Sequence, residues 1–173
     1  FSLTITEVDN LSLVWGYVFH LAALISVIYQ LHVKDSLQDV SGIMYAGAAI
    51  CAVFARDLIT LFVFWELTAI TSVFLIYARR TKKSAQVGTR YLIIQVASGV
   101  ILLFGVALWY KSTGSIVFGE PFTDEWQQVG MFVDEQTRHP INLGAWLILL
   151  AFGMKAAFPF LHNWLQDSYP EAT

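Results

Sequence analysis

Charged residues are scarce in this sequence of 173 residues. They make up 13% of the chain, whereas soluble domains carry about 25%. Hydrophobic residues account for 57% of the chain, and the mean hydropathy is +0.60. This composition favours a lipid bilayer over water as the main solvent, and it argues against a soluble enzyme.

Several kinds of cofactor site are also missing from the sequence. Cys51 is the single cysteine, whereas an iron–sulfur cluster needs about four thiolates and a disulfide needs two. The net charge is −3, so the sequence gives no sign of the basic surface that nucleic-acid binding requires. The sequence contains no Gly-rich phosphate loop, no nucleophilic serine setting and no cluster of metal ligands. We therefore expect no cofactor, no metal and no catalytic site in this chain.

A cleavable signal peptide is not recognisable at the start of the chain. Residues 1–10 lack a basic region and carry Glu7 and Asp9. The first residue is Phe1 rather than Met. We expect an internal piece of a longer product, with residues 1–173 forming a single partial membrane domain.

Long apolar runs dominate the rest of the sequence. Crossing the hydrocarbon core takes about 20 apolar residues in a helix, and polar residues do not recur every three or four positions as they do in amphipathic soluble helices. We therefore predict an all-α, polytopic transmembrane helix bundle with five spans. The expected spans are about residues 13–31, 41–55, 58–77, 91–110 and 141–165.

Basic residues are concentrated in one connection between the spans. The segment 78–90 holds half of the Lys and Arg residues of the chain. Cytoplasmic loops carry an excess of Lys and Arg, so we expect this loop to face the cytoplasm (or matrix). The acidic segment 111–140 should then lie on the outer side. Counting crossings, the spans that hold Glu66 and Lys155 should run parallel.

Glu66 stands near the midpoint of the third span. A carboxylate at the centre of a membrane helix costs at least about 2.5–3.5 kcal/mol, and intramembrane carboxylates are functional by default. The alternative is a protonated carboxyl that joins neighbouring helices by hydrogen bonding. We favour the functional interpretation, in which Glu66 belongs to an ion pathway.

Lys155 is the one charge of the fifth span. A snorkelling lysine is the alternative, but Leu165 near the end of this span lies roughly 15 Å of helix away. Pro159 removes one backbone bond and displaces the carbonyl four residues earlier, which belongs to Lys155. We therefore expect the span to break at Pro159, beside the charge, and to free backbone groups that hold water.

These residues suggest a proton pathway. Burial opposes the charged form of a lysine and a nearby carboxylate favours it. Our hypothesis is that Glu66 sets the proton affinity of Lys155, and that separating the two discharges the proton along a hydrated path. His162, which follows the break, is a candidate relay. His20, in the first span, is better explained as a hydrogen-bonded packing residue.

Two motifs resemble a known family. Residues 56–67, RDLITLFVFWEL, resemble the fifth-helix motif of the antiporter-like subunits of respiratory complex I (NADH:quinone oxidoreductase) and of Mrp-type Na+/H+ antiporters. Residues 152–165, FGMKAAFPFLHNWL, resemble their broken seventh helix. The run 91–110 suits their sixth helix. The likeness covers nearly the whole chain and is strongest to the D-type subunit of the Mrp antiporters.

This resemblance implies a place and a role for the chain. The five spans would be helices three to seven of about fourteen, and Glu66 and Lys155 would occupy the positions of the family's paired glutamate and lysine. The chain would translocate protons (or exchange Na+ for H+) together with other membrane subunits, most naturally in a bacterial or archaeal cell membrane. One departure is Tyr169, which stands where the family often has a histidine.

Two alternatives remain open at this stage. The same fold serves in redox-driven pumps such as complex I or a membrane-bound hydrogenase, where partner subunits hold the flavin and iron–sulfur cofactors. The chain would then be part of an enzyme without a catalytic site of its own. A membrane scaffold that conducts nothing is the other alternative.

Overall fold

The computed structural model describes residues 5–118 and 143–172 of the chain. Within these ranges the chain is helical apart from turns, connections and two isolated backbone bridges, which confirms the all-α prediction. The elements in chain order are α1 (Asn10–Gln30), α2 (Ser36–Val53), α3 (Leu58–Tyr77), α4 (Lys82–Thr113), α5 (Leu143–Lys155), α6 (Asn163–Ser168) and the 3-10 helix η3 (Tyr169–Glu171).

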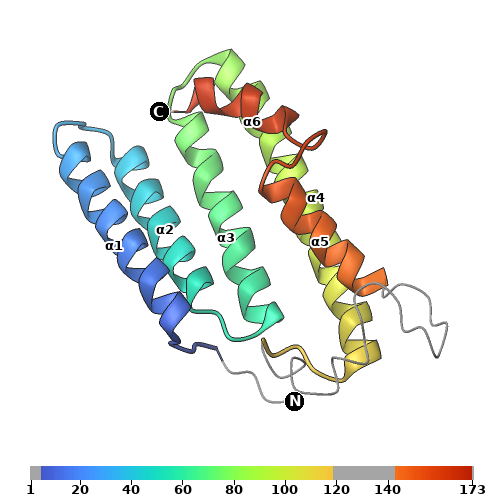
Figure 1. Ribbon diagram of the computed structural model, residues 1–173. Helices are drawn as coiled ribbons and strands as arrows, with labels where there is room; N and C mark the ends of the chain where they lie inside the picture. Colours follow the sequence, from blue (N-terminus) through green and yellow to red (C-terminus); the bar gives the residue numbers. More distant parts are fainter. Residues whose placement is uncertain (1–4, 119–142, 173) are drawn as a thin grey trace.

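The long helices stand side by side in chain order. Each of α1 to α4 packs against the next, and α5 packs against α4. Figure 1 shows that α3 and α5 run in the same direction, and that α6 lies across the end of the bundle where α3 joins α4. The helices that carry Glu66 and Lys155 are therefore parallel, as the count of crossings predicted.

Four of these helices, α1 to α4, are long and apolar enough to cross a membrane. The fifth helix, α5, is apolar but has only 13 residues, which is about 20 Å at 1.5 Å per residue. The expected span 141–165 is thus not one continuous helix. The chain leaves the helix at Lys155, turns, and continues as α6.

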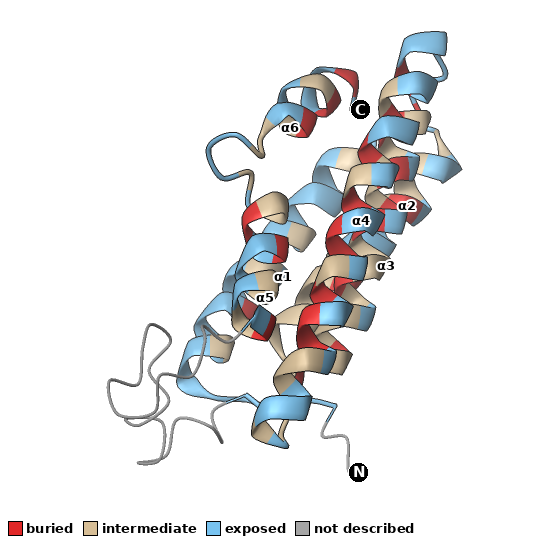
Figure 2. Ribbon diagram, turned by 90° about the vertical axis from the view of Figure 1, so that its right-hand side faces the viewer, coloured by how far each residue is buried: buried red, intermediate tan, exposed pale blue. Residues whose placement is uncertain are grey.

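Burial is concentrated on the inner helices. Figure 2 shows buried residues along α3 and α4, whereas α1 is almost entirely exposed, with Gly16 as its one buried residue. Two apolar clusters form the core. The first joins α3, α4 and α5 and includes Leu58, Trp65, Leu102, Val106 and Ala151; the second joins α6 to α3 and α4 and consists of Val73, Ile76, Tyr91 and Trp164.

The start of α4 differs from the prediction. Segment 78–90 was expected to be a loop, but α4 begins at Lys82. Thr81 caps the helix by accepting a hydrogen bond from the Ser84 N–H at 2.9 Å, and the Ser84 hydroxyl accepts from the Thr81 N–H at 3.0 Å. The prediction was wrong because apolar character marks the depth of the bilayer, whereas capping decides where a helix begins. Of the five basic residues, Arg79 and Arg80 precede α4, whereas Lys82, Lys83 and Arg90 lie on its first three turns.

The end of α5 is a left-handed turn. The Phe158 N–H donates to the Gly153 carbonyl at 2.9 Å, and the Ala157 N–H donates to the Met154 carbonyl at 3.3 Å. Ala157 has φ +56°, so these residues form a Schellman motif with alanine at the position that glycine usually fills. The helix therefore stops four residues before Pro159. The expected break beside the charge is present, and Pro159 follows the turn at a place where the helix cannot continue.

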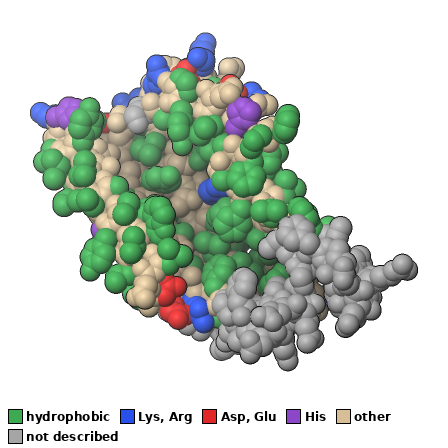
Figure 3. Space-filling model, in the orientation of Figure 1, with side chains coloured by type: hydrophobic (Ala, Val, Ile, Leu, Met, Phe, Trp, Pro, Cys, Tyr) green, Lys and Arg blue, Asp and Glu red, His purple; other side chains and the backbone are tan. Residues whose placement is uncertain are grey.

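Ion pairs hold the C-terminal segment against the end of α3 and α4. Glu171 is buried, and its carboxylate lies 2.6 Å from Lys83 Nζ and 3.5 Å from Arg79. The hydrogen bond from Lys83, assisted by the charge of Arg79, lowers the pKa of the Glu171 carboxyl. Figure 3 shows Lys and Arg side chains gathered at this end, above a mostly hydrophobic side that is hollowed at mid-height.

Candidate functional site

Lys155, the last residue of α5, reaches across to α3. Its Nζ donates a hydrogen bond to the backbone carbonyl of Trp65 at 2.7 Å. The same carbonyl accepts a hydrogen bond from Thr68 Oγ1 at 2.7 Å. Because α5 stops at Lys155, the side chain leaves the helix at its free end. The ammonium is therefore held by a neutral backbone group of the neighbouring helix.

The Trp65 ring lies against this ammonium, and Phe152 packs on that ring. Lys155 Nζ lies 4.6 Å from the centroid of the Trp65 ring, and the Phe152 ring meets the Trp65 ring edge-on at 4.8 Å between centroids. A cation over an aromatic face gains about 2 kcal/mol or more when both are desolvated. The Trp65 ring thus partly offsets the cost of placing a positive charge at this depth.

Glu66 follows Trp65 in the chain but does not touch Lys155. The described residues contain five ion pairs, and the Glu66–Lys155 pair is not among them. The two charges interact electrostatically across a gap. Glu66 Oε1 is buried without a hydrogen-bond partner. Its carboxyl group lies against Gly99 of α4.

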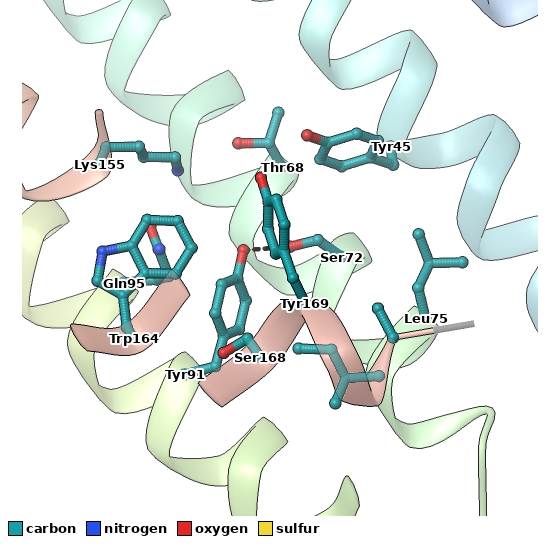
Figure 4. A pocket seen from close by; sticks show the side chains of 12 residues that line it. Tyr45, Thr68, Ser72, Leu75, Tyr91, Gln95, Lys155, Trp164, Ser168 and Tyr169 are labelled. Carbon is teal, nitrogen blue, oxygen red and sulfur yellow. Dashed lines mark hydrogen bonds between the residues drawn. The ribbon is translucent and has the colours of Figure 1, made fainter. Parts of the chain in front are cut away.

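A cavity of about 280 Å³, lined by both polar and apolar side chains, opens beside Lys155. Figure 4 shows side chains projecting into it from α3, α4, α5 and the C-terminal segment. The hydroxyls of Ser72 and Tyr91 are hydrogen-bonded to each other across it at 2.7 Å. The cavity extends from Lys155 toward the end of the bundle where α3 joins α4. Its polar lining is Tyr45, Thr68, Ser72, Tyr91, Gln95, Lys155, Ser168 and Tyr169.

Three buried polar atoms near Lys155 lack a hydrogen-bond partner in the described part of the chain. They are Trp65 Nε1, Glu66 Oε1 and Gln95 Oε1. The Trp65 ring touches Lys155, and Glu66 follows Trp65 in the chain. Gln95 lines the same cavity as Lys155. Buried polar groups are almost always hydrogen-bonded, so such a group is a candidate to bind water or a mobile ion. The region around Lys155 can therefore accept and donate further hydrogen bonds.

The structure separates the two histidines from this region. His162 directly precedes α6, is half-buried, and does not line the cavity. His20 lies exposed on α1, and its ring nitrogen Nδ1 is 2.7 Å from the Gly16 carbonyl of the same helix. The role of His162 as a relay thus stays a prediction.

Other residues of the cavity were only partly visible in the sequence. Gln95 lines the cavity and shares one face of α4 with Ser98 and Gly99, and all three are buried. Tyr91 was missed as a cavity residue, since an aromatic residue at the end of a span is equally typical of the membrane interface. Tyr169, where the family often has histidine, lies in the lining.

Comparison with known proteins identifies the family. Residues 55–173 match the family model described as "NADH:quinone oxidoreductase/Mrp antiporter, TM". This match covers both helices that carry Glu66 and Lys155, and the segment after the break.

Individual relatives come from both branches of that description. The chain is 33% identical to the A-type subunit of the Na(+)/H(+) antiporter of Alkalihalophilus pseudofirmus over 96% of its length and 21% of that protein. It is 34% identical to NADH-quinone oxidoreductase subunit N of Desulfitobacterium hafniense over 68% of its length and 22% of that protein. The chain thus spans about a fifth of these relatives.

Neither of these relatives is a D-type subunit of an Mrp antiporter, so the stronger likeness to that type stays a prediction. The match over residues 55–173 and the apolar helices α1 to α4 agree in making this an integral membrane protein. The chain belongs to the antiporter-like family of transmembrane subunits shared by NADH:quinone oxidoreductase and the Mrp antiporters.

Proposed function

We propose that this chain forms part of a proton (or Na+/H+) translocating subunit in a multisubunit membrane complex. One observation carries the proposal. The Lys155 side chain, at the end of α5, donates a hydrogen bond to the Trp65 carbonyl beside Glu66 and lines a cavity that several hydroxyl and amide side chains also line. The A-type subunit of a Na(+)/H(+) antiporter, which matches nearly the whole chain, supports the same assignment.

Lys155 would be the group that holds the proton. A lysine side chain is a flexible four-carbon stem with a compact charge and three donors. It can exchange the Trp65 carbonyl for water in the cavity without moving a helix. Glu66 would set the proton affinity of Lys155, since a negative charge nearby favours the ammonium form. Motion of Lys155 relative to Glu66 would then decide whether the proton is kept or released.

Water in the cavity would carry the released proton. A volume of about 280 Å³ has room for on the order of ten water molecules at about 30 Å³ each. These water molecules would form a hydrogen-bonded chain. It would be held by the hydroxyls of Ser72 and Tyr91 and by the amide of Gln95. It would lead toward segment 78–90, which we propose faces the cytoplasm. His162 lies outside this cavity, so it would act only as a later relay.

Replacing Lys155 tests the proposal. The Lys155→Ala variant should abolish ion-coupled transport by the assembled complex reconstituted in vesicles, because no other side chain in the described cavity lining carries a positive charge. Lys82→Ala removes an exposed lysine from the first turn of α4 and should leave transport unchanged. Undiminished transport in the Lys155→Ala complex would refute the proposal.

A redox-driven pump is the second candidate. The similarity to NADH-quinone oxidoreductase subunit N, at 34% identity, favours it. The chain would then work beside partner subunits that bind flavin and iron–sulfur clusters. Purification of the native complex distinguishes the two candidates. Flavin and iron–sulfur absorbance would assign the chain to a redox enzyme. An active transporter without this absorbance would assign the chain to an antiporter.

A scaffold that conducts nothing makes a different prediction. In a scaffold, Glu66 would only join helices, so Glu66→Gln would leave transport intact while it disturbs assembly. A transport-defective Glu66→Gln complex that assembles normally would exclude the scaffold.

A further inference from the structure

Gly99 of α4 lies directly against the carboxyl group of Glu66. A Cβ atom at position 99 would collide with Glu66 Oε1, and it would lie 2.5 Å from Cδ and 3.2 Å from Oε2. Carbon and oxygen atoms do not approach this closely without a bond, so the carboxyl group occupies the space that any other residue at position 99 would fill. Gly99 is buried in the interface between α3 and α4.

This contact differs from those of the other tight glycines on α4. A Cβ atom at Gly88 would meet the ring of Tyr77, and one at Gly105 would meet Ile148 and Leu147 at 3.0 Å. Those neighbours are aromatic or aliphatic, so Gly88 and Gly105 serve close packing. Of these three, Gly99 alone faces a carboxyl group.

The carboxyl group forms no hydrogen bond and no ion pair with the described part of the chain. Glu66 Oε1 is buried and has no hydrogen-bond partner, and Glu66 forms no ion pair with Lys155. The carboxyl group occupies space that is open to it because Gly99 has no side chain. A carboxylate that is not fixed by a donor remains free to respond to a nearby cation.

We propose that Gly99 is a positioning residue for ion translocation. It seats the Glu66 carboxyl group between α3 and α4, close enough to act on Lys155 and too far to form a contact ion pair. This inference rests on the proposed function, because it assumes that the charge of Glu66 acts on Lys155. A methyl group at position 99 would displace the carboxyl group and change that separation.

The test is a pair of substitutions measured together. Gly99→Ala should lower ion-coupled transport by the reconstituted complex at least about tenfold, since a misplacement of about 1 Å can cost a hundredfold. Glu66→Asp withdraws the carboxyl group by one methylene and makes room for the methyl group. In the Glu66→Asp background we therefore expect Gly99→Ala to change transport by less than about twofold, a non-additivity typical of residues in contact.

Two other glycines supply matched controls. Gly47 of α2 has no atom near its Cβ position, so Gly47→Ala should leave transport and its pH profile unchanged. Gly105→Ala introduces a methyl group into a tight apolar contact; it should reduce assembly without shifting the pH profile, and Glu66→Asp should not relieve it. Gly99→Ala should shift the pH profile.

The outcomes separate this inference from the proposed function. Wild-type transport and pH profile in Gly99→Ala would overturn the positioning role. An equal loss from Gly99→Ala in the wild-type and Glu66→Asp backgrounds, whether in transport or in assembly, would overturn it as well. If Glu66→Gln transports normally, the proposed function itself fails. If Glu66→Gln is inactive and Gly99→Ala is normal, only the role of Gly99 fails.

Discussion

Lys155 donates its hydrogen bond to the backbone carbonyl of Trp65, at 2.7 Å, and not to the carboxylate of the next residue, Glu66. A direct ion pair in a low-dielectric site is hard to separate. A bond to a neutral carbonyl leaves the lysine under the influence of the carboxylate without being bound to it. This arrangement would suit the proton-carrying role that we propose for Lys155.

The left-handed turn after Lys155 predicts that one alanine is strained. An L-residue with positive φ costs about 1–2 kcal/mol, and Ala157 has φ +56°. Ala157→Gly removes the Cβ but adds unfolded-state entropy, so we expect a net stabilisation of about 0.5–1 kcal/mol. Slower hydrogen exchange at residues 153–158 would report it. Ala156→Gly, outside the positive-φ region, should speed exchange; the reverse order would contradict this prediction.

The indole of Trp164 donates a hydrogen bond to a backbone carbonyl in the last turn of α5. Its Nε1 donates to the Met154 carbonyl at 2.9 Å, while its ring packs on Tyr91. Trp164→Phe keeps an aromatic ring and removes the donor, at a cost of about 0.5–1.5 kcal/mol. We expect faster hydrogen exchange over residues 156–169. Trp15→Phe, on the exposed face of α1, should not change it, and equal protection in both variants would count against the bond.

The ion pairs of Glu171 predict that the docking of the C-terminal segment weakens in acid. The pKa of the Glu171 carboxyl is lowered from its ordinary value of 4.5. The ionised carboxylate therefore contributes fully to the stability of the docked segment above about pH 4.5, and this stabilisation is lost as the pH falls through the lowered folded-state pKa. Proteolysis of the segment 163–171 should therefore accelerate in this acidic range. Glu171→Gln should be equally susceptible at all these pH values, and Asp39→Asn should behave like wild type. Retained pH dependence in Glu171→Gln would assign it to another group.

Much of this arrangement was predictable from the sequence. Apolar runs predicted the helices, and isolated charges at Glu66 and Lys155 singled out the two residues that the fold places on neighbouring parallel helices. Charge and hydropathy suffice for this because a bilayer penalises every polar group strongly. The pattern did not predict that α4 begins at Lys82, since its first turns are polar.

The contacts of the site were not predictable in the same way. Lys155 is held by the carbonyl of Trp65, and every residue has a carbonyl, so this acceptor leaves no mark in the sequence. Gly99 was visible as one of several small residues on α4, but its contact with Glu66 depends on the rotation of α4 against α3. Ala157 adopts a conformation typical of glycine, so the position of the helix end was hidden as well.

The pH profile of transport in the Glu66→Gln complex tests the central claim most directly. If the Glu66 charge tunes Lys155, its removal weakens the hold on the proton, and the profile should move to lower pH by about one unit or more while the complex assembles normally. A Glu66→Gln complex with the rate and profile of the wild type would contradict the account.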